Sequence, residues 1–115
     1  AAFLLAWRYP DYFSKAICLS PAFKYETYDL TEQIKNFNGP KKDIALYFYN
    51  GGLGVDSVLQ QGVDLMKIAL IKKGFIEGKD LFIKIDKSAE HNERAWAKTV
   101  PYFLKLFYKK KLMRF

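Results

Sequence analysis

The chain has 115 residues, half of them hydrophobic, and a formal net charge of +7. This length is enough for one small domain with a buried core, so extensive disorder is excluded. The single cysteine, Cys18, excludes an intrachain disulfide and with it the class of small disulfide-stapled secreted domains. Because Cys18 lies between Ile17 and Leu19, we expect a small core residue rather than a reactive thiol.

The sequence opens on an apolar run, Ala1 to Trp7, without an initiator Met. The run fits a helix over residues 2–9 that ends before Pro10, because proline disfavours helical geometry in the preceding residue. It is far shorter than the roughly 20 residues that cross a bilayer, and Arg8 follows it, so it predicts neither a membrane span nor a signal peptide. Since it begins like the middle of a helix, we expect the chain to be a fragment of a longer protein.

The next segments predict one strand and one short helix. Residues 15–19 form an apolar run that ends at Ser20, which is typical of a buried strand leaving a sheet. Residues 22–28 are aromatic and are expected to be irregular. Asp29 or Thr31 can then cap a short helix that extends to about residue 37.

A second strand and the clearest helix follow. Residues 43–49 are almost continuously apolar and aromatic, as expected for a strand of a parallel sheet that is covered on both faces. Residues 50–54 are predicted to be a loop. Apolar residues then recur at helical spacing from about Ser57, and Gly74 supplies the stop after a cationic last turn.

The last third predicts a third strand, a loop and a terminal helix. Residues 80–86 alternate in hydrophobicity but carry charges, which indicates a position nearer the sheet edge. A loop over residues 87–92 leads to an amphipathic helix over about 95–107, in which Pro101 is tolerable as a kink or as the junction of two helices.

The alternation of helices and strands predicts the fold class. This order favours parallel strands with right-handed crossovers, so we expect an α/β fold with a mainly parallel sheet and helices on both faces, with residues 1–115 forming part of a single domain. Three such apolar strands would leave exposed sheet edges, which suggests that more strands belong to the parent protein.

Two residues with catalytic chemistry fall in neighbouring loops of this sheet. Ligands gather beyond the carboxyl ends of parallel strands, and there Asp56 and His91, the only histidine, follow the second and third strands. A histidine that takes a proton from a hydroxyl needs a carboxylate on its other ring nitrogen, which Asp56 can supply. On the residues alone, a lone histidine is more often structural, and Asp56 can also be a helix N-cap or a first-turn carboxylate. One histidine without clustered cysteines predicts no metal site, and no cofactor is expected.

Other candidates for the site are weaker. Glu90 and Glu93 lie too close to His91 in sequence to be favoured as its orienting partner. Phe23 and Tyr25, which follow the first strand, are candidate substrate-binding residues that could line an acyl or alcohol pocket, or could equally cover the core.

Two motifs carry a resemblance to a known family. The first is Ala6-Trp7-Arg8-Tyr9-Pro10-Asp11-Tyr12-Phe13 followed by Ala16-Ile17-Cys18-Leu19-Ser20-Pro21-Ala22-Phe23. It resembles the segment after the nucleophile elbow in the α/β-hydrolase family of esterase D-like, enterochelin esterase-like and feruloyl esterase-like enzymes. The second is His91-Asn92-Glu93 with Ala95-Trp96, which resembles the catalytic-histidine loop of that family where it enters the last helix.

The resemblance implies the C-terminal half of an α/β-hydrolase fold with a triad in the chain order Ser, Asp, His. His91 maps onto the general base and Asp56 onto the acid. No G-x-S-x-G occurs, since Ser14, Ser20, Ser57 and Ser88 all lack that glycine frame, so the nucleophile is expected upstream of Ala1.

The partners implied are therefore a small-molecule ester and the N-terminal half of the same domain, with no nucleic acid and no membrane. Two alternatives stay open: a hydrolase-like scaffold that binds without catalysis, and a basic binding module that uses Lys109 to Lys111.

Overall fold

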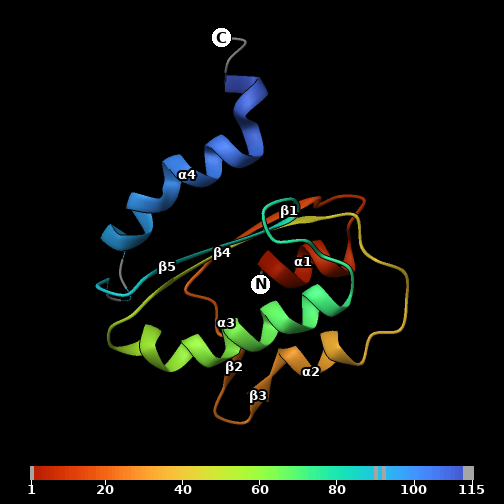
Figure 1. Ribbon diagram of the computed structural model, residues 1–115, viewed down its shortest axis with the longest axis horizontal. Coiled ribbons are helices and arrows are strands. Elements are labelled where there is room, and N and C mark those ends of the chain that lie inside the picture. Colours follow the sequence, from red (N-terminus) through yellow and green to blue (C-terminus); the bar gives the residue numbers. More distant parts are fainter. Residues whose placement is uncertain (1, 90, 92, 113–115) are drawn as a thin grey trace.

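The computed structural model describes residues 2–89, 91 and 93–112, with the backbone alone at 106 and 108–112 (Figure 1). Its elements follow one another in the order α1 (Ala2–Arg8), β1 (Lys15–Leu19), β2 (Lys24–Tyr25), β3 (Tyr28–Asp29), α2 (Leu30–Lys35), β4 (Ala45–Gly51), α3 (Val55–Lys72), β5 (Leu81–Asp86) and α4 (Glu93–Leu112).

The three longer strands form one parallel sheet in the order β1-β4-β5. β4 is the central strand, in which Ala45 is paired with Lys15 of β1 and Leu46 with Leu81 of β5. The predicted α/β class and the parallel pairing of the three strands are confirmed. The charged third strand lies at one edge of this sheet, as its pattern indicated.

Helices cover both faces of the sheet. Successive side chains of β4 point to opposite faces and therefore enter two different clusters. Leu46 and Phe48 join the cluster of α1 and α3, whereas Tyr47 and Tyr49 join that of α4. Figure 1 shows α1, α2 and α3 below the sheet and α4 above it. The near-continuous apolar run of β4 is therefore explained by burial on both sides.

The larger core lies on the α1 and α3 face and is rich in aromatic rings. Phe3 stacks on Trp7 with ring centroids 5.8 Å apart and meets Phe23 edge-on at 5.4 Å. Phe23 also meets Phe48 of the central strand edge-on at 4.8 Å. Full burial of side chains of this size stabilises a fold by about 1.5–3 kcal/mol each, so this cluster is a major part of what holds α1 to the sheet.

Cys18 lies in the same core. It is 7% exposed, and burial raises the pKa of its thiol to about 12. The prediction of a core residue is confirmed.

The structure differs from the predicted boundaries around β4. The strand was predicted over 43–49 but runs from Ala45 to Gly51, so the loop that was expected from Asn50 begins at Gly52. The reason is tertiary: β5 continues to Asp86, which is paired with Gly51, and that pairing extends β4 past the apolar run. The helix α3 begins earlier than predicted, at Val55.

Residues 22–28, which were expected to be irregular, contain part of a small antiparallel hairpin. β2 pairs with β3, and Glu26 in the turn has a left-handed φ of 55°. Directly after the hairpin, Asp29 is the N-cap of α2 and accepts the backbone N–H of Thr31 at 3.0 Å. This contact decides between the two caps that the sequence allowed.

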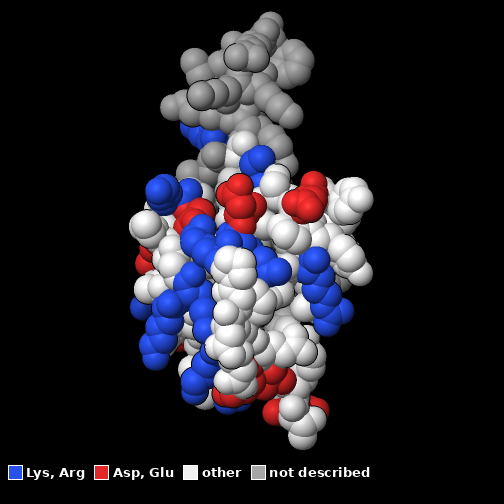
Figure 2. Space-filling model, turned by 90° about the vertical axis from the view of Figure 1, so that its right-hand side faces the viewer, with Lys and Arg blue, Asp and Glu red and all other residues white. Residues whose placement is uncertain are grey.

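The positive charge is dispersed over the face of the molecule that Figure 2 shows. Figure 2 shows Lys and Arg side chains on both sides of an uncharged strip, with Asp and Glu side chains above and below it. Some of the lysines are paired, as in Lys41 with Asp80 at 2.7 Å and Lys67 with Glu77 at 3.2 Å. The side chains of Lys109 to Lys111, on which the basic-module alternative rests, lie outside the described part of the structure.

Candidate functional site

The candidate site lies at the carboxyl edge of the parallel sheet, where all three strands contribute. Ser20 directly follows β1, Gly51 ends β4, and the loop after β5 carries His91. Asp56 comes from the first turn of α3, the helix that follows β4. Parallel strands bring these segments together because their carboxyl ends share one edge.

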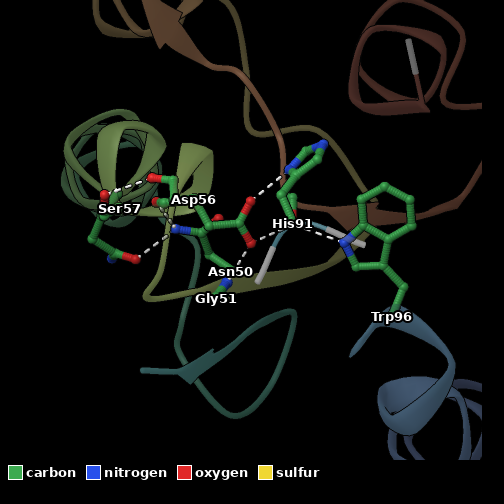
Figure 3. A network of polar contacts seen from close by, with 9 residues as sticks. Asn50, Gly51, Asp56, Ser57, His91 and Trp96 are labelled. Carbon is green, nitrogen blue, oxygen red and sulfur yellow. Dashed lines mark hydrogen bonds and ion pairs between the residues drawn. The ribbon is translucent and has the colours of Figure 1, made fainter. Parts of the chain in front are cut away.

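Asp56 and His91, the two residues predicted to pair, are in contact (Figure 3). One carboxylate oxygen of Asp56, Oδ1, lies 2.5 Å from Nδ1 of His91. Asp56 is fully buried, whereas the His91 side chain is 37% exposed. The imidazole therefore has one nitrogen held by a buried carboxylate while the ring keeps access to the surface.

Of the two structural alternatives for Asp56, an N-cap and a first-turn carboxylate, the structure shows the second, because Asp56 lies in the first turn of α3 but is not its N-cap. The N-cap position of α3 is Gly54, with a φ of 59°, and no side chain caps the helix there. The carboxylate instead faces the loops around it.

The second oxygen of Asp56, Oδ2, is held by two donors. The Ser20 hydroxyl donates to it at 2.7 Å and the backbone N–H of Gly51 donates at 2.7 Å. A buried carboxylate costs a large desolvation free energy unless it is hydrogen-bonded, and here the two donors come from the ends of two neighbouring strands, β1 and β4. The result is a carboxyl group whose orientation is fixed from both sides.

Trp96 completes this network from the first turns of α4. Its indole N–H donates to the Ser20 hydroxyl at 2.8 Å, and its ring meets the His91 ring edge-on with centroids 5.0 Å apart. Ser20, Asp56, His91 and Trp96 thus form one connected cluster. Figure 3 labels Asp56, His91 and Trp96 of this cluster.

Two glycines at the end of β4 allow the histidine loop to approach. A Cβ on Gly51 would lie 2.4 Å from the carbonyl oxygen of Ala89, and one on Gly52 would lie 2.2 Å from that of Lys87. The backbone N–H groups of Gly52 and Leu53 both donate to the Ala89 carbonyl at 3.1 Å. The glycine run therefore lets the loop before His91 dock on backbone rather than on side chains.

Asn50, near the end of β4, holds the start of α3 through its side-chain amide. Its amide nitrogen donates to the backbone oxygen of Asp56 at 2.9 Å and to the side-chain oxygen of Gln60 at 2.8 Å. Asn50 is fully buried, and its bond to the Asp56 backbone is made away from water. This bond holds the backbone of Asp56 as the other partners of Asp56 hold its side chain.

The structure does not bring the two predicted substrate-binding residues to the Asp56–His91 pair. Phe23 is 3% exposed and belongs to the core beneath the sheet, which supports the alternative that it covers the core. Together with Tyr28 it also lines a hollow of about 240 Å³. Tyr25 lies on the exposed hairpin.

A larger opening borders the histidine itself. Its volume is about 560 Å³, and it is lined by His91, Glu93, Arg94 and Trp96. Glu93 is exposed in the first turn of α4, whereas Asp56 makes the described contact with His91. Glu90, the other acid that the sequence offered, lies outside the described residues.

The arrangement suits general base chemistry. When the Nδ1–H of His91 donates a hydrogen bond to Asp56, the Nε2 atom is left as the acceptor. Among the residues that the structure describes, no three His, Cys, Asp or Glu side chains converge as a metal site would require. Within the same ranges, none of the helices combines the length and apolar character that a bilayer crossing needs.

Sequence reasoning identified Asp56 and His91 but gave no role to Ser20 or to the Gly51-Gly52 pair. One signal was available: Ser20 also follows a predicted strand of the parallel sheet, so it shares the same edge as the other two loops. No protein-family model, curated protein or solved structure matches the chain.

Proposed function

We propose that the chain is the C-terminal half of a serine ester hydrolase of the α/β-hydrolase fold. His91 is its general base and Asp56 orients the imidazole. The observation that carries the proposal is the 2.5 Å contact between His91 Nδ1 and a fully buried carboxylate at the carboxyl edge of a parallel sheet. A paired acid and histidine bordering an opening at the strand ends is typical of functional sites.

The proposed reaction uses a serine from the N-terminal half of the same domain. The serine oxygen attacks the ester carbonyl while His91 Nε2 takes the hydroxyl proton. The tetrahedral intermediate then expels the alcohol, which receives that proton from His91. A water molecule, activated by the same nitrogen, hydrolyses the acyl-enzyme and releases the acid. Asp56 stabilises the imidazolium at both stages.

Two features of β1 support an N-terminal half that adds to this sheet. Among the described strands, β1 pairs with β4 alone, which leaves its other side available to a further strand. The start of α1 lies near the carboxyl end of β1, since Phe3 of α1 lines the same hollow as Cys18 and Leu19 of β1. A strand-turn-helix elbow leading into α1 would therefore deliver its serine near the edge that carries His91.

The test is His91→Ala in the complete protein, assayed with p-nitrophenyl acetate. We expect kcat to fall by about 10³-fold or more, because both proton transfers are lost. Glu93→Gln is the matched control, since Glu93 lines the same opening but does not hold the pair. Its kcat should stay within about twofold of the wild-type value.

Circular dichroism and urea unfolding of both variants check that the fold is intact. Turnover by His91→Ala close to that of the wild type would remove His91 from the mechanism. Absence of ester hydrolysis in the wild-type protein would favour the alternative of a scaffold that binds without catalysis.

A further inference from the structure

Ser20 occupies a position that packing alone does not explain. It is a non-glycine residue with a left-handed φ of 50°, a conformation that costs side chains other than Gly, Asn and Asp free energy. It is also 6% exposed, and its hydroxyl has two partners that come from distant parts of the chain. The strained backbone aims this hydroxyl at Asp56.

The chemistry of the two partners fixes the direction of both hydrogen bonds. The indole N–H of Trp96 can only donate, so the Ser20 oxygen accepts from it at 2.8 Å. The ionised carboxylate of Asp56 can only accept, so the Ser20 proton is directed to its Oδ2 at 2.7 Å. The chain of donors therefore runs one way, from α4 to Asp56.

This direction also separates Ser20 from the role of nucleophile. A nucleophilic serine gives its proton to the histidine, whereas the Ser20 proton is committed to the carboxylate. His91 meets the opposite oxygen of Asp56, Oδ1. Ser20 and His91 thus hold the two oxygens of one carboxyl group.

We propose that Ser20 is a positioning residue that couples α4 to the catalytic pair. It accepts a hydrogen bond from the Trp96 indole of α4 and fixes the orientation of the Asp56 carboxylate, which in turn sets the tautomer of His91. The proposal rests on the catalytic role proposed above for the Asp56–His91 pair. In this arrangement α4 and the loop after β1 together set which nitrogen of His91 carries the proton.

Ser20→Gly is the variant that tests the role, because glycine adopts a φ of 50° without strain while the hydroxyl is lost together with its Cβ. In the complete protein with p-nitrophenyl acetate we expect kcat to fall about tenfold with KM unchanged, as when an outer hydrogen bond to an orienting group is lost. Glu26→Gly is the matched control, since it relieves the same left-handed strain in the β2–β3 turn, away from the network. Its kcat should not change.

The second readout does not depend on catalysis. Nitrogen-15 NMR of the His91 imidazole, assigned by comparison with His91→Ala, reports which ring nitrogen is protonated. We expect the wild type and Glu26→Gly to show the Nδ1–H form and Ser20→Gly to show a mixture. Unchanged His91 spectra in Ser20→Gly would overturn the proposal even if the kcat were lower.

A double-mutant cycle with Trp96→Phe tests the relay through α4. Phenylalanine keeps a ring beside His91 but removes the N–H that reaches Ser20. We expect Ser20→Gly and Trp96→Phe combined to shift the tautomer ratio no further than Ser20→Gly alone. Additive shifts would show that the two residues act separately. A wild type without esterase activity would refute the proposed function, while the NMR cycle would still decide the role of Ser20.

Discussion

Two helices of this molecule begin with an aspartate in or next to their first turn, and the two carboxylates behave differently. Asp29 precedes α2 and caps that helix: it accepts hydrogen bonds from the backbone N–H and the hydroxyl of Thr31. Asp56 lies inside the first turn of α3 and binds segments outside its helix: it accepts hydrogen bonds from Gly51, Ser20 and His91. One is partly exposed and the other fully buried.

The difference shows how a helix start becomes a site. At α2 a local contact two residues away satisfies the carboxylate, so its position depends on its own turn. At α3 the N-cap position is Gly54, which offers no side-chain cap. The Asp56 carboxylate is instead hydrogen-bonded by partners up to 36 residues away. The same residue type is a structural cap in one place and a junction between loops in the other.

The largest expected effect contrasts the two aspartates directly. In the complete protein, Asp56→Asn should lower kcat for p-nitrophenyl acetate by about 10³–10⁴-fold, because the amide favours the wrong histidine tautomer. Asp29→Asn should leave kcat unchanged, since asparagine is also a good cap. Equal kinetics for Asp56→Asn and the wild type would move the acid role to another carboxylate.

The next effect concerns the close approach of the His91 loop to the end of β4, beside the start of α3. Gly51→Ala places a methyl group against the Ala89 carbonyl and beside the Asp56 carboxylate, so the loop that carries His91 must move. We expect the free energy of unfolding in urea to fall by about 2 kcal/mol. Gly78→Ala is the control: it has a φ of 91° but open space around it, and should cost less than Gly51→Ala. A smaller loss for Gly51→Ala than for Gly78→Ala would contradict the docking of this loop on Gly51.

The smallest effect is the acid sensitivity of the cap. The Thr31 hydroxyl, helped by Lys24 and backbone N–H groups, lowers the pKa of Asp29 below its ordinary value of 3.8. The stability that Asp29 adds is therefore present above that value and is lost as the pH falls through the lowered folded-state pKa. Asp29→Asn should lose less unfolding free energy than the wild type between neutral pH and about pH 3, measured in urea. An identical loss in both proteins would mean that the Asp29 charge adds nothing.

The sequence predicts the sheet and the central pair because both follow from local pattern and chain order. Apolar runs locate the three strands, and parallel topology brings the loops that follow them to one edge. Asp56 and His91 could therefore be paired, although they lie 35 residues apart.

The rest of the site depends on the register between distant segments. Ser20 meets Trp96 across 76 residues, and no periodicity in the sequence encodes that contact. The close approach of Gly51 to Ala89 likewise follows from where β5 ends relative to β4. The β2–β3 hairpin escaped prediction because each of its strands has only two residues, too few to show an alternating pattern.

The buried thiol in β1 has a practical consequence for labelling chemistry. Alkylating and disulfide-forming reagents attack the thiolate, and a cysteine whose pKa is about 12 carries almost none at neutral pH. Cys18 is also the only cysteine of the sequence. Ser57 is exposed and lies beside the proposed acid. In a Ser57→Cys variant, a maleimide dye would therefore label one position in the folded chain without removal of the native thiol.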